Sequence, residues 1–459
     1  MSNPIFESFL STPEMQALFD ADSVVQAMLD FESSLIRAQA LEGIVPASAA
    51  EVIAATCNLA SVDVDAIVAA SGRAGSVAIP LVKALTEAVK LKSAEAARYV
   101  HWGSTSQDVI DTAMVLVTRR AFALVEADLS ALTTSLLKLA DTHESTPLLA
   151  RTLMQPAQVI SFGFKAISWI APLVRTHERL REASRRALQL QLGGAVGTLA
   201  IMGDKGNAVA RRMGLDLDLA VPPGPWHTQR DEWVSFGCEV GVLCGALGKI
   251  AKDISLLAQG EIGEVAEPSG GGRGGSSAMP HKRNPVSSMV GIAAATRAPH
   301  RVAALLAAMP QEHERGLGNW QAELAEWAGL WISAHGSVKA LADAAAGLQV
   351  DAAHMRTNID ALHGLVFAEA VSMHFASAIG KAKAHHLIEG LSQAVVATGR
   401  PLSELTLEAL REDTELSRAI NEADVQALFD TDHAALPAIA QAKPQLATLA
   451  QRAAKLTAR

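Results

Sequence analysis

A glycine-rich loop followed by polar residues is the segment whose residue types are best suited to chemistry. Five glycines lie within residues 267–275, and they are followed by Ser276, Ser277, Lys282 and Asn284. Each glycine costs roughly 1 kcal/mol relative to alanine inside a helix, so this run predicts a loop. A mobile loop that carries a potential base, a cation and an amide is typical of an active-site segment.

A second candidate site precedes the longest stretch without glycine or proline, residues 104–146. At 1.5 Å per residue this stretch predicts a helix of roughly 60 Å. Backbone N–H groups at the start of a helix favour anions, so we expect Thr105 and Ser106 to bind a carboxylate. His101 is a further candidate catalytic residue, although a histidine beside a tryptophan can also be a packed, hydrogen-bonded side chain.

Long helices are the elements that must position these residues. Further helical stretches are predicted at 156–191, from about 228, at 284–309 and at 317–345. The stretch from 228 contains four glycines that would allow close helix packing: Gly237, Gly241, Gly245 and Gly248. Near the N-terminus, Asp22 or Ser23 is expected to cap a helix that stops at Gly43.

The pattern therefore predicts an all-α protein in three parts. These are an N-terminal helical domain (1–103), a central long-helix bundle that carries the loop (104–350) and a C-terminal helical domain (351–459). Helices this rich in alanine, leucine and valine cannot bury all of their apolar surface within one chain, so we expect an oligomer.

Composition excludes several classes of protein. The chain has 459 residues, 49% of them hydrophobic, and a formal net charge of −9, so nucleic-acid binding is not expected. The three cysteines are odd in number and lack metal-ligand spacing. There is no secretory signal and no apolar run of membrane-spanning length, so we expect a soluble, cytoplasmic protein that binds no membrane.

The string Gly274–Pro285 resembles the signature of the fumarase/aspartase superfamily, whose members eliminate or add across a carbon next to a carboxylate. Residues 98–108 resemble a further block of the superfamily. Within the superfamily, five other segments resemble the bacterial 3-carboxy-cis,cis-muconate cycloisomerases, namely 28–32, 78–85, 225–231, 308–320 and 364–370. The resemblance implies an all-α fold and a homotetramer in which each active site is shared between subunits. It also implies conversion of 3-carboxy-cis,cis-muconate to 4-carboxymuconolactone in the β-ketoadipate route for aromatic breakdown.

One departure from the superfamily pattern concerns the residue that protonates the leaving group in many of its lyases. That residue is a histidine, and Leu153 occupies its position here. An amine or hydroxide must be protonated before it leaves, whereas a carboxylate, whose acid has a pKa near 4, need not be. The leucine therefore favours a reaction in which a carboxylate leaves or adds, as in lactone formation from a muconate.

The resemblance also assigns roles. Ser276 is expected to carry the proton, with Ser277 a less favoured carrier, and Lys282 to stabilise the anionic intermediate. A substrate with three carboxylates needs cations and neutral donors, and bidentate arginines suit planar carboxylates. The expected substrate-binding residues are Thr105, Ser106, Gln155, Gln229, Arg230, Asn284 and Arg315. Arg230 and Arg315 each have acidic neighbours in sequence and can alternatively form surface ion pairs. No metal-ligand set or phosphate-binding loop is present, so no cofactor is expected.

Three alternatives remain open at this point. One is a fumarate-releasing lyase such as adenylosuccinate lyase, against which Leu153 argues. Another is a 3-sulfomuconate cycloisomerase, which the changes at Leu153, Pro156 and Val77 leave open. The third is a catalytically inactive structural protein on the same fold, as the lens crystallins are, against which Ser276, Lys282 and Asn284 argue.

Overall fold

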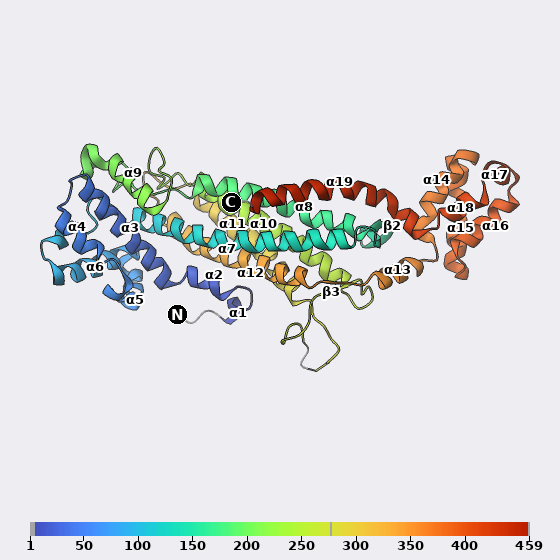
Figure 1. The fold of residues 1–459 in the computed structure, drawn as a ribbon, viewed down its shortest axis with the longest axis horizontal. Helices are drawn as coiled ribbons and strands as arrows, with labels where there is room; N and C mark the ends of the chain where they lie inside the picture. The colour runs from blue at the N-terminus through green and yellow to red at the C-terminus, as the bar shows by residue number, and fades with distance from the viewer. Residues whose placement is uncertain (1–4, 276–277, 458–459) are drawn as a thin grey trace. The chain divides into compact units, whose positions relative to one another are not determined.

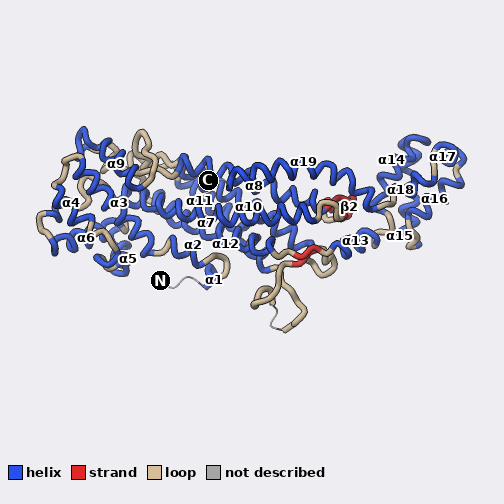
Figure 2. The backbone as a smooth tube through the Cα atoms, viewed as in Figure 1, coloured by secondary structure: helices blue, strands red, loops and turns tan. Residues whose placement is uncertain are grey.

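The computed structural model describes residues 5–275 and 278–457, so that Ser276 and Ser277 lie outside the described residues. The chain is 72% helical, which confirms the all-α prediction (Figure 2). It divides into two compact units, each assembled from separate segments of the chain. The first comprises Met1–Leu129, Arg175–Gly248 and Val290–Ala340, and the second comprises Ser130–Val174, Lys249–Met289 and Leu341–Arg459. The three-part division expected from the sequence stays a prediction.

Ten helices in the described residues of the first unit lie outside the central long helices. They are α1 (Ile5–Ser8), α2 (Pro13–Leu18), α3 (Ala21–Leu41), α4 (Ala47–Ala54), η1 (Leu59–Ser61), α5 (Val64–Ala74), α6 (Ala78–Lys92), η2 (Ala96–Tyr99), η3 (Ala200–Lys205) and α9 (Gly206–Leu217). The cap of α3 differs from our expectation, because the carboxylate of Asp20 accepts a hydrogen bond from the Ser23 N–H at 2.8 Å. The helix ends at Leu41, two residues before Gly43, as the glycine predicts.

The central part of the described chain contains five long helices, which are divided between the two units by residue number and can be followed along the chain in Figure 1. They are α7 (Ser106–Thr142), α8 (Phe162–Ala187), α10 (Asp231–Leu257), α11 (Val286–Ala308) and α12 (Asn319–Ala346). Four of them match the predicted stretches to within a few residues. The prediction for α8 was wrong at its start, because the segment that leads into it is a β-strand.

Aromatic rings fill the core of the first unit. The indoles of Trp233 and Trp327 stack with their centroids 3.9 Å apart and their planes 16° apart. Phe236 and Trp331 meet edge to face beside them, with centroids 5.1 Å apart. The buried Trp327 also donates its indole N–H to the Thr118 hydroxyl at 2.8 Å, so that the one polar group of this ring is hydrogen-bonded in the core.

Close packing explains most of the glycines of α10. A Cβ at Gly241 would lie 2.6 Å from Val302, and one at Gly248 would lie 2.3 Å from Ala295, both on α11. Such distances leave no room for a side chain, which confirms the predicted role of these glycines in helix packing. Gly245 is different, because a Cβ there would meet nothing within 4 Å among the described residues, so packing within the chain does not explain this glycine.

One helix within the described residues, α10, is long and apolar enough to cross a membrane by itself. A second span would require α13 (Ala352–Asp360) and Leu365–Ile379 to count as one, although these segments meet at 79°. The apolar window of α10 corrects our expectation that no stretch would reach spanning length. More than half of that window, 56%, is buried inside the protein, as in the core helix of a soluble protein.

The second unit contains the strands and the C-terminal helices. Strands β1 (Pro147–Thr152) and β2 (Gln155–Ser161) form an antiparallel hairpin, and β3 (Val265–Ala266) pairs with β4 (Gln349–Val350). The helices are α13 (Ala352–Asp360), η4 (Leu365–Phe367), α14 (Ala368–Ile379), α15 (Lys381–Thr398), α16 (Leu402–Glu412), α17 (Thr414–Ala419), α18 (Glu422–Ala427) and α19 (Thr431–Thr457). Val371, Phe375, Ile388 and Leu410 form the centre of the cluster that holds α14, α15 and α16 together.

Candidate active site

The N-terminus of α7 is held in place by one buried carboxylate. Asp108 accepts hydrogen bonds from the backbone N–H groups of Thr105 at 3.1 Å and of Gly193 and Gly194 at 2.9 Å each. The ring Nε2 of His227 lies 2.7 Å from the same carboxylate. The first turn of α7 is therefore fixed to two distant loops of the first unit, which gives the neighbouring hydroxyls a rigid base.

Arg315 lies directly at this helix start. Its guanidinium donates to the Thr105 hydroxyl at 2.5 Å, to the Ser106 hydroxyl at 3.0 Å and to the Gln107 amide oxygen at 3.3 Å. No carboxylate among the described residues pairs with it, and the neighbouring Glu312 instead accepts from the Leu317 N–H. An unneutralised guanidinium, two hydroxyls and a helix N-terminus together make a site suited to a carboxylate.

Arg230 occupies a different environment from the one that a substrate-binding role requires. Its side chain is buried and its guanidinium bonds both Asp111, at 2.9 Å, and Glu323, while lying 4.5 Å above the Trp226 ring. Burial opposes its charge, yet the two carboxylates outweigh that effect and raise the pKa of Arg230 above its usual range. Four of its N–H groups donate to Asp111 and Glu323. Arg230 therefore does not form the surface ion pair with a sequence neighbour that was the alternative expectation.

His101 lies in the turn just before α7. Its ring Nδ1 is 2.6 Å from the carboxylate of Glu32 on α3, and its backbone has a φ of 58°. Burial acts to lower the pKa of His101, but the attraction and hydrogen bond of Glu32, with a smaller contribution from Asp108, raise it overall. His101 is therefore hydrogen-bonded, as the alternative interpretation expected. It is not fully packed, because 18% of its side chain is exposed.

The two predicted glutamines lie in different units. Gln155 is the first residue of β2, where it pairs with Thr152 across a two-residue turn formed by Leu153 and Met154. Both turn residues have positive φ, 51° and 68°, as such a hairpin turn requires. Gln229 lies in the first unit, where its amide donates to the Pro225 carbonyl at 3.3 Å. Gln155 and Gln229 are both exposed.

The glycine-rich loop runs from β3 to α11 in the second unit and is drawn as loop throughout its described part (Figure 2). The Asn284 N–H donates to the Gly274 carbonyl at 2.9 Å, and a Cβ at Gly274 would lie 2.6 Å from the backbone carbonyl oxygen of Asn284. The ammonium of Lys282 makes no hydrogen bond or ion pair within residues 5–275 and 278–457, and its side chain is exposed. The proposed proton carrier Ser276 and its neighbour Ser277 lie outside the described residues.

Sequence reasoning missed the carboxylates that organise these sites. Glu267 accepts from the N–H groups of Ser287 and Ser288 at 2.9 and 2.8 Å and so caps the start of α11 after the loop. In the hairpin, Arg151 forms a two-pronged ion pair with the buried Glu264, with distances of 2.7 and 3.0 Å. Glu267 is the first residue of the glycine-rich run and was the one signal that the sequence offered. Glu264 lies 113 residues from Arg151, and partners that far apart cannot be identified from spacing along the chain.

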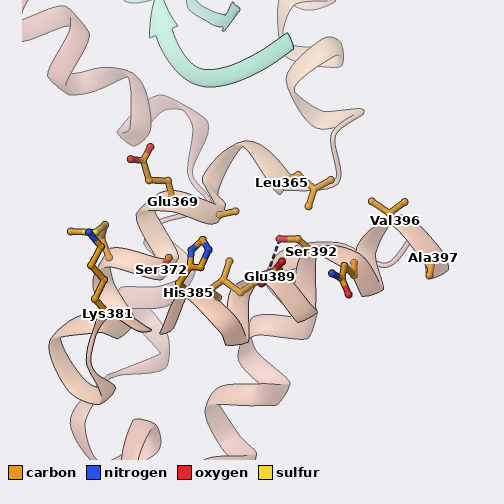
Figure 3. A pocket seen from close by; sticks show the side chains of 13 residues that line it. Leu365, Glu369, Ser372, Lys381, His385, Glu389, Ser392, Val396 and Ala397 are labelled. Carbon is orange, nitrogen blue, oxygen red and sulfur yellow. Dashed lines mark hydrogen bonds between the residues drawn. The ribbon is translucent and has the colours of Figure 1, made fainter. Parts of the chain in front are cut away.

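A cavity of about 950 Å³ lies against α14 and α15 in the second unit (Figure 3). Its charged lining residues are Glu369, Glu389 and Lys381, with His385 beside them. Two carboxylates in one cavity disfavour a ligand with several negative charges, so the cavity does not suit the predicted substrate. Across the described ranges, no group of three His, Cys, Asp or Glu residues is arranged to hold a metal ion.

The comparisons with known proteins agree with the motifs. The family model described as Lyase matches residues 9–299. The 3-carboxy-cis,cis-muconate cycloisomerase of Bradyrhizobium diazoefficiens is 46% identical over 428 residues, which cover 93% of this chain and 94% of that protein. The cycloisomerase of the same name from Pseudomonas aeruginosa is 48% identical over 416 residues, 91% of each chain.

The fold gives the same result. The crystal structure of the 3-carboxy-cis,cis-muconate lactonizing enzyme from Pseudomonas putida matches with a TM-score of 0.91 and 42% sequence identity, covering 99% of this chain and all of the other. Similarity of this extent confirms the resemblance that the loop motif indicated. The chain therefore belongs to the lyase family of the fumarase/aspartase superfamily.

Proposed function

We propose that this protein catalyses the lactonisation of 3-carboxy-cis,cis-muconate to 4-carboxymuconolactone. The observation that carries the proposal is the similarity to named cycloisomerases at 46% and 48% identity over more than nine-tenths of the chain. Similarity that extends over both units includes the helix starts, the hairpin and the glycine-rich loop, and not merely a shared scaffold.

The cluster at the start of α7 supports binding of an anionic substrate. Arg315 presents a guanidinium that no carboxylate of the described residues neutralises, between the hydroxyls of Thr105 and Ser106. We assign these three residues to one substrate carboxylate, and Lys282, Asn284, Gln155 and Gln229 to the remaining contacts. We leave Arg230 out of this set, because Asp111 and Glu323 already use its N–H groups, and assign it to holding α7, α10 and α12 together.

The reaction moves one proton and no electrons between molecules. One substrate carboxylate oxygen adds to a carbon of a double bond, and negative charge builds up on the neighbouring carboxylate as an aci-anion. Lys282 and loop N–H groups stabilise that anion, and such preorganised donors are each worth about 3–4 kcal/mol in other enzymes. Ser276 donates its proton to the adjacent carbon and recovers one from water, which completes the lactone.

Leu153 supports a reaction that needs no acid at the leaving group. It lies at the tip of the hairpin, with 97% of its side chain exposed, and an alkyl side chain neither donates nor accepts a proton. In the reverse direction, the group that leaves is a carboxylate, which is stable as an anion. The position that holds a histidine in many lyases of the superfamily can therefore lack one without a loss of activity in lactonisation.

We propose further that the enzyme is a cytoplasmic homotetramer whose active sites are shared between subunits. Apolar side chains on the long helices support an assembly, because Val242 on α10 and Leu306 on α11 are 48% and 50% exposed. Exposed apolar residues on neighbouring helices of an enzyme of this superfamily suit burial against a second copy. Size-exclusion chromatography with light scattering tests the tetramer, and a monomer would contradict it.

The decisive experiment follows the loss of conjugated-diene absorbance when the purified protein is mixed with 3-carboxy-cis,cis-muconate. Parallel samples contain 3-sulfomuconate and adenylosuccinate. Rapid loss with the carboxymuconate is expected, with slower or no turnover of the others. A higher kcat/KM for the sulfomuconate would move the proposal to that substrate, and release of fumarate from adenylosuccinate would overturn it.

A further inference from the structure

The turn that leads into α7 is held by two buried polar side chains of a single helix. Glu32 and Gln39 lie seven residues apart on α3, which places them on the same face two turns apart. The carboxylate of Glu32 contacts the His101 ring, and the amide of Gln39 donates to the Trp102 carbonyl at 2.7 Å. Only 1% of Glu32 and none of Gln39 is exposed.

Burial of a carboxylate costs free energy unless a partner compensates its charge. Carboxylates are almost never fully buried unless they are paired, and the partner of Glu32 is a residue that keeps contact with the surface. His101 also has a φ of 58°, a backbone conformation that residues other than glycine adopt at a cost. The contacts from α3 hold His101 in this unfavourable backbone conformation. The residue lies directly before the two hydroxyls that Arg315 contacts.

The hydrogen bond also decides which ring atom is available. Nδ1 faces Glu32 at 2.6 Å, and Nε2 has no hydrogen-bond partner within the part of the chain that the structure describes. A carboxylate at Nδ1 fixes the proton on that nitrogen and favours the doubly protonated ring, so that Nε2 becomes a charged donor. A second cationic donor next to the Arg315 cluster suits a substrate with three carboxylates.

We propose that Glu32 is a positioning residue for the reaction, which orients His101 and keeps its ring cationic so that Nε2–H binds a carboxylate of the substrate. Two carboxylates act on the ring, Glu32 from α3 and Asp108 from α7, and both favour its charged form. The inference rests on the proposed function and adds to it the residue that sets the charge of His101.

The test compares the pH dependence of kcat and KM in the wild type and in Glu32→Gln, which keeps the shape of the side chain and removes its charge. Loss of an opposite charge at this distance lowers the pKa of a histidine by about 1–3 units. The fall in kcat/KM on the alkaline side should therefore move to lower pH by at least one unit. At pH values above the pKa of His101 in the variant, the loss should be roughly tenfold or more and appear mainly in KM, whereas at pH values well below that pKa the variant should approach the wild type.

Matched variants separate positioning from structure. Asp30→Asn removes an exposed acid two residues away on α3 and should leave the profile unchanged. Glu32→Asp keeps the charge and should restore most of the alkaline activity. Adding Glu32→Gln to His101→Asn should have no further effect on the profile, because the charge then has no ring to act on.

Any of the following results would overturn the inference. One is a loss in Glu32→Gln by the same factor at every pH, which indicates a structural role, and another is an equal shift in Asp30→Asn. If Glu32→Gln does not fold, His101→Asn decides, because an unchanged alkaline limb in that variant excludes a cationic His101. A wild type without activity on 3-carboxymuconate would overturn the proposed function as well, whereas an active wild type with an unmoved Glu32→Gln profile overturns this inference alone.

Discussion

Arg315 and Thr105 are 210 residues apart in the sequence, and the guanidinium of the first donates to the hydroxyl of the second at 2.5 Å. Both residues belong to motifs that sequence analysis singled out separately. The contact turns two motifs into one anion site at the start of α7. It also shows that the alternative reading of Arg315, a surface ion pair with a neighbouring glutamate, is wrong, because Glu312 bonds a backbone N–H instead.

Replacement of Arg315 by lysine should weaken substrate binding. An ammonium cannot reproduce the forked contacts of a guanidinium, and hydrogen bonds to charged groups contribute about 1.5–3 kcal/mol each. We expect KM to rise roughly 10- to 100-fold while the thermal midpoint changes little. Steady-state kinetics measure the change, and Arg186→Lys, an exposed residue paired with Glu232, is the control. An unchanged KM would remove Arg315 from the substrate site.

Replacement of Ser276 by alanine should abolish most turnover. Proton transfer by a positioned side chain contributes typically about 10²- to 10⁴-fold, so kcat should fall by this range with little change in KM. Ser269→Ala, an exposed serine earlier in the same loop, should retain activity. Full turnover in Ser276→Ala together with a loss in Ser277→Ala would transfer the role to the second serine.

Introduction of a histidine at position 153 should not accelerate lactonisation. Because a carboxylate needs no proton to leave or to add, Leu153→His is expected to change kcat by less than about twofold, well below the contribution of a working general acid. Histidine tolerates a positive φ better than leucine does, so the hairpin should not be destabilised. Leu153→Asn controls for polarity at the hairpin tip. A large gain in the muconate rate would refute the leaving-group argument.

Disruption of the buried charge cluster around Arg230 should lower the stability of the fold. Glu323→Gln leaves Arg230 with one carboxylate, and breaking a buried ion pair costs about 3–5 kcal/mol. We expect a markedly lower midpoint in urea or on heating, monitored by circular dichroism. Glu232→Gln, which breaks an exposed pair with Arg186, should change stability by less than about 1 kcal/mol. Equal effects of the two changes would show that the buried cluster contributes no more to stability than the exposed pair does.

The amino-acid sequence by itself determined the long helices, the glycine-rich loop and the motifs of the family. These features depend on residues close together along the chain. The absence of glycine and proline from 104–146 favours α7, and the five glycines of 267–275 prevent a helix before α11. Gly241 and Gly248 could be anticipated for the same reason, since small residues at helical spacing allow close packing.

Only the tertiary structure decided which polar residues are buried and which remain available. Arg230 and Arg315 have similar acidic neighbours in sequence, yet the first is enclosed by Asp111 and Glu323 and the second faces two hydroxyls. The β1–β2 hairpin likewise depends on pairing between two strands, which prevailed over the helical tendency after Pro156. Burial and strand pairing are set by segments that meet through folding of the whole chain, and for that reason local sequence patterns cannot specify them.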